Sequence, residues 1–258
     1  MKATVLASGS KGNCTYIEGD SGAILIDAGL SAKETLKRLE LSDGKKDLIK
    51  AILVTHEHTD HIKGLDVLAR KLGVPVISTQ GTLWEFEGKR KSDKPITLEA
   101  IKTGEEFSVD GFFVKAFSTY HDACDPCGFC ISENDTMLGF CTDTGQITDK
   151  MLSYLQKCDS LILESNHCPI MLENGPYPVF LKERIRDVKR GHLSNNAASE
   201  CLNKMNGDVG DVILAHLSEE NNRPDKALET ARKGTGLFAD SINFHVSLQH
   251  EPAKTIEI

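Results

Sequence analysis

The stretch Thr55-His-Glu-His-Thr-Asp-His61 carries the strongest signal in this sequence. It places three histidines and one aspartate within six residues, directly after an apolar run. Imidazole and carboxylate groups are ligands that zinc, manganese and iron accept. In a tight loop between a strand and a helix, His56 and His58 can reach one metal ion, while Asp60 and His61 can reach a second. This density of potential ligands favours a metal site over a solvated polar loop.

Four ligands cannot complete two metal sites, so further ligands are expected at the ends of other strands. His121, Asp143 and His216 each follow an apolar, β-rich run, and Asp27 follows another near the N-terminus. Any one of them alone is typical of a polar residue that ends a strand. Their common position, beside the histidine-rich loop, predicts that they converge on the metal site.

Apolar, β-rich runs alternate with amphipathic helical patterns along the chain. Strands are predicted at residues 3–7, 23–27, 51–55, 74–78, 112–117, 137–142, 161–163, 212–215 and 242–248. Helices are predicted at residues 62–72, 148–157, 195–205 and 224–232, and from the capping box Ser31-Ala-Lys-Glu34 to about Leu39. This order favours an α/β layered sandwich with sheets inside and helices outside. The polar stretch Lys89–Lys94 is interpreted as a loop between two halves, and Trp84 as a core residue.

Length and composition limit the possible classes of protein. The chain has 258 residues, of which 40% are hydrophobic, so it can bury a sizeable core and is not disordered, collagenous or a coiled coil. We expect one domain over residues 1–258. The 30 basic and 38 acidic residues give a net charge of −8, so binding of nucleic acid requires local basic patches or metal ions.

Targeting signals and cysteine usage favour a cytoplasmic protein without a membrane partner. The N-terminal apolar run is too short for a signal peptide, and no run approaches the roughly 20 apolar residues of a membrane span. Eight cysteines in a chain of this length do not indicate a secreted disulfide framework, so reduced thiols are expected. Cys124-x-x-Cys-x-x-Cys130 lacks a second paired motif, and Cys130 is expected in a strand that starts near Gly128. Both points favour free thiols over a metal cluster.

Together, these residues resemble the five ordered motifs of the metallo-β-lactamase-fold hydrolases over residues 3–245. The resemblance implies a four-layer αββα sandwich that binds two divalent metal ions (zinc, manganese or iron) at one edge. It also implies the ligands: His56, His58 and His121 for the first metal, Asp60, His61 and His216 for the second, and Asp143 as a bridge between them. Asp27 is implied to orient the histidine loop, a role that is common behind metal ligands.

Further segments indicate one branch of that family. True β-lactamases usually have a cysteine at the fourth motif, whereas this chain has Asp143 together with His61, so drug hydrolysis is not expected. Several segments resemble the YycJ-like (WalJ) branch, which is related to ribonuclease Z and associated with 5′-to-3′ exonuclease activity on DNA: Ser8–Asn13, His121–Phe129, Leu163–His167, Gly191–Asn195 and His216–Asn222. The chain departs from that branch at Cys124, Cys127 and Cys168.

Glu164 and His192 resemble the pair that ribonuclease Z-type enzymes use for proton transfer beside the metals. Hydrolysis of a phosphodiester calls for such a pair, because the departing sugar oxygen is a poor leaving group that must receive a proton. His192 would supply this proton and Glu164 would hold its imidazole, while Asp60 would orient the bridging hydroxide. The alternative is that His192 merely precedes a helix beginning near Ser194.

A basic segment is a candidate for binding the substrate backbone. Lys182–Arg190 contains five basic and two acidic residues, 5 − 2 = +3, and it ends two residues before His192. We therefore expect Lys189 and Arg190 on a phosphate track, although a solvated helix face explains the segment equally well.

The glycine-containing loop Ser8–Asn13 is a second candidate, through Ser8, Ser10 and Asn13. Its backbone N–H groups would bind a terminal phosphate, as such loops can. A glycine-rich turn that merely joins two strands is the favoured reading of this loop.

The leading hypothesis is a dinuclear metal phosphodiesterase that acts on nucleic acid, with DNA favoured as the substrate of a 5′-to-3′ exonuclease. Only 21 residues separate His121 from Asp143, which leaves no room for the tRNA-clamping arm of ribonuclease Z. The alternatives are a glyoxalase II-type thioester hydrolase, a ribonuclease of the same fold, and a non-catalytic metal-binding regulatory protein. Glu164 with His192 argues against the thioester hydrolase, and the complete ligand set argues against the regulatory protein.

Overall fold

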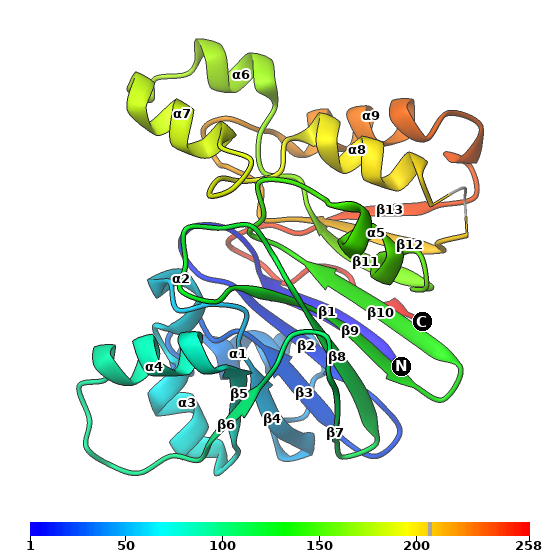
Figure 1. The fold of residues 1–258 in the computed structure, drawn as a ribbon. Coiled ribbons are helices and arrows are strands. Elements are labelled where there is room, and N and C mark those ends of the chain that lie inside the picture. The colour runs from blue at the N-terminus through cyan, green and yellow to red at the C-terminus, as the bar shows by residue number, and fades with distance from the viewer. Residues whose placement is uncertain (206–207) are drawn as a thin grey trace.

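The computed structural model describes residues 1–205 and 208–258. Within these residues, two seven-stranded sheets pack face to face, and helices cover the outer face of each (Figure 1). This arrangement is the four-layer αββα sandwich of the α/β class, as predicted. The two ends of the chain meet at the first sheet, where the Ile258 N–H donates to the Met1 carbonyl at 2.9 Å.

The first sheet comes from the N-terminal half of the chain and one short C-terminal strand. Its order is β14-β1-β2-β3-β4-β5-β6, antiparallel from β14 to β3 and parallel from β3 to β6. Its strands are β1 (Lys2–Ala7), β2 (Cys14–Glu18), β3 (Ala23–Ile26), β4 (Ile49–Leu53), β5 (Val76–Thr79), β6 (Leu98–Ile101) and β14 (Ile256–Glu257). The helices of this half are α1 (Ala32–Leu41), α2 (Thr59–Ile62), α3 (Leu65–Leu72) and α4 (Gln80–Lys89).

The second sheet repeats this plan with the C-terminal half. Its order is β13-β12-β11-β10-β9-β8-β7, antiparallel from β7 to β10 and parallel from β10 to β13. Its strands are β7 (Glu106–Val109), β8 (Phe112–Ser118), β9 (Cys127–Glu133), β10 (Thr136–Cys141), β11 (Ser160–Glu164), β12 (Asp211–Ala215) and β13 (Asn243–Val246). The helices of this half are α5 (Asp149–Leu155), α6 (Pro169–Asn174), α7 (Val179–Arg186), α8 (Asn195–Asn203) and α9 (Pro224–Thr235).

Three apolar layers hold the sandwich together. The central layer lies between the sheets and contains fully buried side chains such as Ile24, Phe112 and Phe129. One outer layer packs the first sheet against α1, α3 and α4, and the other packs the second sheet against α5, α8 and α9. Inner strands such as β3 are buried on both faces, which explains their continuous apolar sequences.

The predicted helix at residues 62–72 is two helices, because α2 ends at Ile62 and α3 begins at Leu65. Gly64 lies between them in a tight contact, where an added Cβ would approach the Leu30 carbonyl oxygen to 2.0 Å. The Gly64 N–H donates to the Ala28 carbonyl at 2.8 Å. This contact fixes α2, which carries two candidate ligands, against the segment that follows β3.

Other local predictions had mixed outcomes. Ser31 caps α1 by accepting a hydrogen bond from the Glu34 N–H, as predicted, and the helix continues to Leu41. Trp84 is not a core residue, since its side chain is 67% exposed on α4. The stretch Lys89–Lys94 does not separate the halves, because β6, which follows it, still belongs to the first sheet.

The sequence patterns did not predict β2, β6, β7, β14, α4, α6 or α7. Most of these elements lie at the rim of a sheet or carry few buried residues, so their apolar pattern is weak. No helix in the described part of the chain has both the length and the apolar character needed to span a bilayer.

Candidate metal centre

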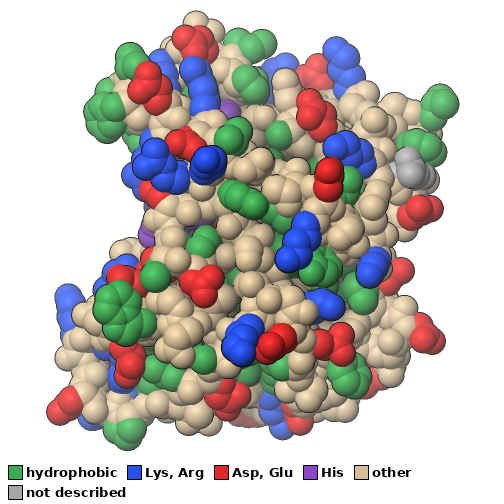
Figure 2. Space-filling model, viewed as in Figure 1, with side chains coloured by type: hydrophobic (Ala, Val, Ile, Leu, Met, Phe, Trp, Pro, Cys, Tyr) green, Lys and Arg blue, Asp and Glu red, His purple; other side chains and the backbone are tan. Residues whose placement is uncertain are grey.

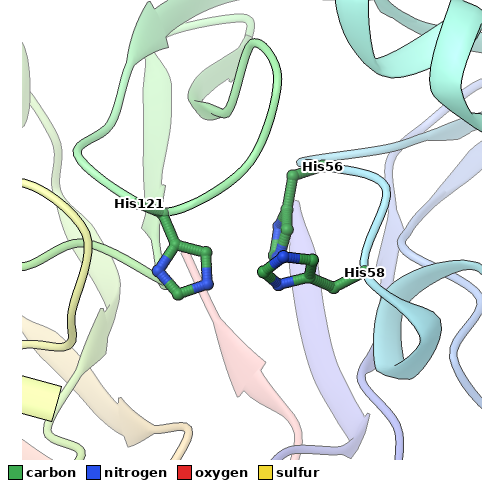
Figure 3. Close-up of side chains that lie close together, drawn as sticks. All are labelled: His56, His58 and His121. Atoms are coloured by element: carbon green, nitrogen blue, oxygen red, sulfur yellow. The ribbon is translucent and has the colours of Figure 1, made fainter. Parts of the chain in front are cut away.

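The candidate ligands lie at the ends of strands along one edge of the sandwich. The first group comes from the loop after β4 and from α2, and the others follow β8, β10 and β12. Parallel strands bring their carboxyl ends to a common edge, so residues far apart in sequence meet there. Figure 3 shows His56 and His58 on one loop and His121 on another, with the three imidazoles directed into a shared space.

The first cluster consists of His56, His58 and His121, whose potential ligand atoms all lie within 4.8 Å of one another. The Nδ1 of His121 donates to the Gly191 carbonyl at 3.0 Å, which leaves Nε2 free for the shared space. Burial lowers the pKa of His56 and of His121, and nearby imidazoles lower the pKa of His56 further. Both rings are therefore held neutral, the form that binds metal ions.

The second cluster consists of Asp60, His61 and His216, whose ligand atoms also lie within 4.8 Å of one another. The Asp60 carboxylate lies 3.4 Å from His61 Nε2 and 3.6 Å from His216 Nε2. Burial alone would lower the pKa of His216, but Asp143, Asp60 and Glu164 raise it to about 10. The cluster therefore combines imidazole and carboxylate donors in a strongly negative environment.

Asp143 lies between the two clusters. Its carboxylate oxygens are 3.4 Å from His61 Nε2, 3.5 Å from His216 Nε2 and 3.8 Å from His121 Nε2. Burial would raise the pKa of Asp143, but His216 and His61 outweigh it and lower the pKa. This buried carboxylate is thus ionised and accessible to both clusters.

Divalent cations fit this arrangement, on the evidence of buried atoms without a partner. His56 Nε2, Asp143 Oδ2 and His216 Nε2 are buried and make no hydrogen bond within the described residues. Each such atom costs about 1–3 kcal/mol when it stays unsatisfied. One cation in each cluster, with Asp143 between them, would satisfy these atoms, and the His and Asp donors suit zinc, manganese or iron.

Asp27 supports His61 from behind. Its carboxylate is fully buried, accepts hydrogen bonds from the Thr55 N–H and hydroxyl, and lies 2.8 Å from His61 Nδ1. This contact places the His61 proton on Nδ1 and directs Nε2 toward the site. The geometry is that of a residue that orients a ligand.

The backbone is strained at three of the candidate site residues. Asp27, Asp143 and His216 have φ values of 61°, 56° and 55°, in the left-handed region that residues other than glycine seldom adopt. Each lies within two residues of the end of a strand. Such conformations cost about 1–3 kcal/mol each and concentrate at functional sites.

Glu164 and His192 form a hydrogen-bonded pair beside the second cluster. Glu164 Oε1 lies 2.7 Å from His192 Nδ1, and its Oε2 accepts the Thr144 and Leu193 N–H groups. Burial opposes ionisation of Glu164, but His192 and His216 lower its pKa. This contact fixes the His192 ring beside the second cluster, and the His192 side chain is partly exposed.

Ser8 and Asn13 are buried and belong to the framework of the site. The Ser8 hydroxyl accepts the His216 N–H at 2.7 Å, and the Asn13 amide lies against Asp60 and His61. The N–H groups of Gly9, Lys11, Gly12 and Asn13 donate to protein oxygens. These four N–H groups of the loop 8–13 are therefore engaged within the protein.

Ser10 and Arg190 do line a pocket beside the site, with a volume of about 210 Å³. Its other walls come from α7 and from the segments around the candidate ligands: Asn166, Tyr177, Leu181, Arg184, Ile185, His192, His216, Leu217 and Ser218. Lys189 is exposed on the turn between α7 and His192 and does not line this pocket. The basic segment is thus partly helix and partly turn.

The three cysteines of the motif Cys124-x-x-Cys-x-x-Cys130 do not gather around a metal. Cys124 is exposed, whereas Cys127 and Cys130 are buried in β9, and all are free thiols. Burial raises the pKa of Cys127. Among the described residues, the clusters with metal-ligand spacing contain only His, Asp and Glu.

Sequence reasoning missed two residues that hold the ligands in place. The Thr55 hydroxyl lies 3.0 Å from His56 Nδ1, and the Asn166 amide donates to the His216 carbonyl at 2.8 Å. Thr55 lies in the histidine-rich stretch, and Asn166 lies in the segment Leu163–His167 that resembles one branch of the family. Their role depends on which neighbour the side chain meets in space, which no spacing reveals.

Comparison with known proteins agrees with this fold. A family model described as a beta-lactamase superfamily domain matches residues 23–217. The chain therefore belongs to the metallo-β-lactamase-fold, metal-dependent hydrolases, as the motifs predict.

Two relatives and one solved structure are similar to most of this chain. Exodeoxyribonuclease YycJ of Bacillus anthracis is 37% identical over 227 residues, which are 87% of this chain and 85% of the relative. Exodeoxyribonuclease WalJ of Streptococcus pneumoniae is 36% identical over 228 residues, which are 86% of this chain and 83% of the relative. Among solved structures, the metallo-beta-lactamase fold protein YhfI from Bacillus subtilis covers 99% of both chains with a TM-score of 0.73 and 14% identity, a likeness of fold.

Proposed function

We propose that the protein is a phosphodiesterase that binds two divalent metal ions and degrades DNA from the 5′ end toward the 3′ end. One observation carries this proposal above all. Asp143 lies between two clusters of three ligands each, and the Glu164–His192 pair borders the same space. The names of the YycJ and WalJ relatives, both exodeoxyribonucleases, support DNA as the substrate.

The residues divide the work of hydrolysis between them. Bound metal ions would supply Lewis acidity toward the phosphate and activate the attacking water. His56, His58 and His121 would hold one ion, Asp60, His61 and His216 the other, and Asp143 both. Asp60, on the exposed side of its cluster, would orient the attacking group.

His192 is the proton donor in this proposal. Glu164 accepts a hydrogen bond from the Nδ1–H of His192, which fixes the ring so that Nε2 can carry a proton toward the departing sugar oxygen. The His192 ring stacks on that of His216, with centroids 5.3 Å apart, so the donor stays beside the second cluster. A thioester would not need this donor, because a thiolate leaves readily; the pair therefore favours the phosphodiesterase over a glyoxalase II-type enzyme.

The cysteines support a cytoplasmic location for this activity. The structure shows eight free thiols, of which six are buried. Thiols persist in a reducing compartment, and cysteines in secreted proteins usually pair.

The proposed activity is tested by the release of nucleotides from double-stranded DNA with a labelled 5′-phosphate, in the presence of manganese. We expect labelled mononucleotides from the wild type and at least a hundredfold slower release from Asp60→Ala, as expected when a group that acts in the transition state is lost. Asp47→Ala, an exposed carboxylate far from the site, is the matched control and should keep the wild-type rate.

Parallel reactions separate the alternatives. Faster release from single-stranded RNA of the same sequence would make the enzyme a ribonuclease, and turnover of S-lactoylglutathione would make it a thioester hydrolase. Equal release by the wild type and Asp60→Ala would show that a contaminant cleaves the DNA. A metal-loaded wild type without turnover on any of these substrates would indicate a regulatory protein.

A further inference from the structure

We propose that α6 and α7 form an arm that binds unpaired bases of the strand entering the metal centre, with Phe180 as the stacking residue. The arm comprises residues Pro169–Arg186. This inference rests on the proposed function, because it takes nucleic acid as the substrate. The inference adds to the proposed function a surface that contacts the substrate and a preference of the enzyme for single-stranded ends.

The arm stands apart from the body of the protein. Figure 1 shows α6 and α7 projecting beyond both sheets, next to the edge where the candidate ligands lie. Helix α7 has no buried residue, and α6 buries only Leu172. Because these two helices pack so little against the core, core packing constrains their sequence little. Their side chains are therefore available to form a binding surface.

The arm exposes large apolar side chains. Ile170 is 73% exposed, Val179 is 70% exposed and Phe180 is 72% exposed. Single exposed apolar residues are common, but three of this size on two short helices are a typical mark of a binding surface. Phe180 is the aromatic member and offers a flat face to a partner.

This surface is continuous with the pocket beside the metal centre. Leu181, Arg184 and Ile185 of α7 line that pocket together with His192. Phe180 lies one helical turn before Arg184, so its side chain borders the row that faces the pocket. Arg184 also pairs with Asp122, the neighbour of His121, which ties the arm to the loop of the first cluster.

The charge of the surface suits a nucleic acid. Figure 2 shows Lys and Arg side chains gathered above a hollow in which His side chains are visible. Residues 169–190 contain five basic and three acidic side chains, 5 − 3 = +2, in a chain of net charge −8. Aromatic faces beside basic side chains are how proteins bind single strands without regard to sequence.

A second copy of this chain is the competing occupant. A symmetric dimer through the arm would place the same surface of both copies together. That arrangement would bring two basic pockets close to each other and would cover the approach to both metal centres. The charge therefore favours the anionic strand.

Equilibrium binding of a fluorescent oligonucleotide tests the arm. The probe is a short, single-stranded DNA with a 5′-phosphate and phosphorothioate linkages that resist cleavage, and the protein is loaded with manganese. We expect Phe180→Ala to weaken binding at least about fivefold, the lower end of what one stacked base contributes. Phe180→Trp, which keeps a stacking face, should bind as tightly as the wild type.

Two controls isolate the contact with bases. Phe113→Ala removes another exposed phenylalanine, 54% exposed on β8 at the end away from His121, and should leave binding unchanged. An abasic oligonucleotide keeps the phosphates but has no bases at the positions that would reach the arm. It should bind the wild type more weakly and show no further loss with Phe180→Ala.

Three results would overturn the inference. The first is that Phe180→Ala binds the oligonucleotide as tightly as the wild type does. The second is that Phe180→Ala weakens binding of the abasic probe as much as binding of the probe with bases. The third is that the wild type is a dimer in solution and Phe180→Ala is a monomer. Turnover of thymidine 5′-(p-nitrophenyl phosphate) by the wild type reports separately on the metal centre, because this substrate has no neighbouring base. Its absence would count against the proposed function, whereas its presence with unchanged Phe180→Ala binding would count against the arm alone.

Discussion

At the scale of single residues, the site depends on side chains that hold other side chains. Asp27 is fully buried and strained at φ 61°, yet it faces His61 and not the open site. The buried, strained state of Asp27 costs free energy, and the benefit of this cost is the orientation that Asp27 gives to the loop of ligands. Residues of this kind are sensitive to small chemical changes, because an amide cannot replace both acceptor oxygens of a carboxylate.

Asp27→Asn should weaken metal binding about 10- to 100-fold, the usual effect of losing a residue behind a ligand. The new amide would place a donor against either the Thr55 N–H or His61 Nδ1. Competition with a chelating dye measures the affinity. Asp110→Asn, at another residue with positive φ but outside the site, is the control. Unchanged affinity in Asp27→Asn would show that Asp27 does not orient the loop.

His192→Ala should slow the release of nucleotides from DNA by about 10²- to 10⁴-fold, the range for loss of a general acid. The same variant should lose much less on a p-nitrophenyl phosphodiester, since p-nitrophenolate leaves without a proton. Glu164→Gln should show the same split, and the double variant should be little slower than either single one. Equal losses on both substrates would rule out proton donation by His192.

The sequence alone predicted the seven candidate ligands that the structure brings together, because each follows an apolar strand and the motifs have a fixed order. It did not predict the roles of Thr55 and Asn166, which depend on contacts across the fold. Asn13 was one candidate for a substrate contact, and the turn 8–13 folds its amide inward against Asp60. Spacing shows which strand end carries a residue, but not the direction of its side chain.

At the scale of elements, the loop of ligands is held by close backbone contacts. An added Cβ on Gly29 would lie 1.6 Å from the Asp60 carbonyl oxygen and 2.7 Å from the Asn13 nitrogen. The Asn13 N–H donates to the same carbonyl at 2.7 Å. The segments after β1 and β3 therefore clamp the start of α2, and the position of Asp60 depends on them.

Gly29→Ala should displace α2, lower stability by about 1–3 kcal/mol and reduce metal affinity. Gly88→Ala is the matched control, because Gly88 lies in α4 with open space around it and alanine favours a helix by up to about 1 kcal/mol. Urea unfolding with and without metal measures both effects. Similar stability and affinity in the two variants would contradict the proposed clamp.

His167, at the base of the arm, makes the stability of the protein depend on pH in the acid range. Burial lowers the pKa of His167 to about 4, from an ordinary value of 6.5. His167 also joins the end of β11 to the segment of His192, through the Asn195 N–H that donates to its carbonyl. Because the folded pKa is the lower one, its contribution is complete above pH 6.5 and is lost as the pH falls toward 4.

The free energy of unfolding should fall by about 3 kcal/mol, because each unit of difference between the folded and unfolded pKa corresponds to about 1.4 kcal/mol. Urea unfolding of His167→Gln between pH 7 and pH 4 should therefore show a shallower decline than the wild type. His250→Gln, a change of an exposed histidine, should follow the wild-type curve. Parallel curves for His167→Gln and the wild type would show that His167 is not the group responsible.

At the scale of the whole molecule, the two halves are joined in one core and one site. The central apolar layer takes side chains from both sheets, and the ends of the chain pair at the first sheet. The first cluster needs His121 from the second half, and the second cluster needs His216. We propose that residues 1–258 form one domain, which should unfold in a single transition whose midpoint rises when metal is bound.

The layered plan could be predicted from the alternation of strands and helices, because it follows from which elements must bury an apolar face. The arm could not, since α7 buries no residue in the core. Trp84 was misplaced for the same reason, because an aromatic residue in a sequence does not show whether the fold covers it.

The central claim is that residues from both halves hold two metal ions that share Asp143. The measurement that tests it most directly is the metal content per chain after gel filtration, by elemental mass spectrometry, for the wild type and Asp143→Ala. We predict two ions per wild-type chain and fewer than one per Asp143→Ala chain, because both clusters lose their common carboxylate. One ion or none in the wild type, or two in Asp143→Ala, would contradict the claim.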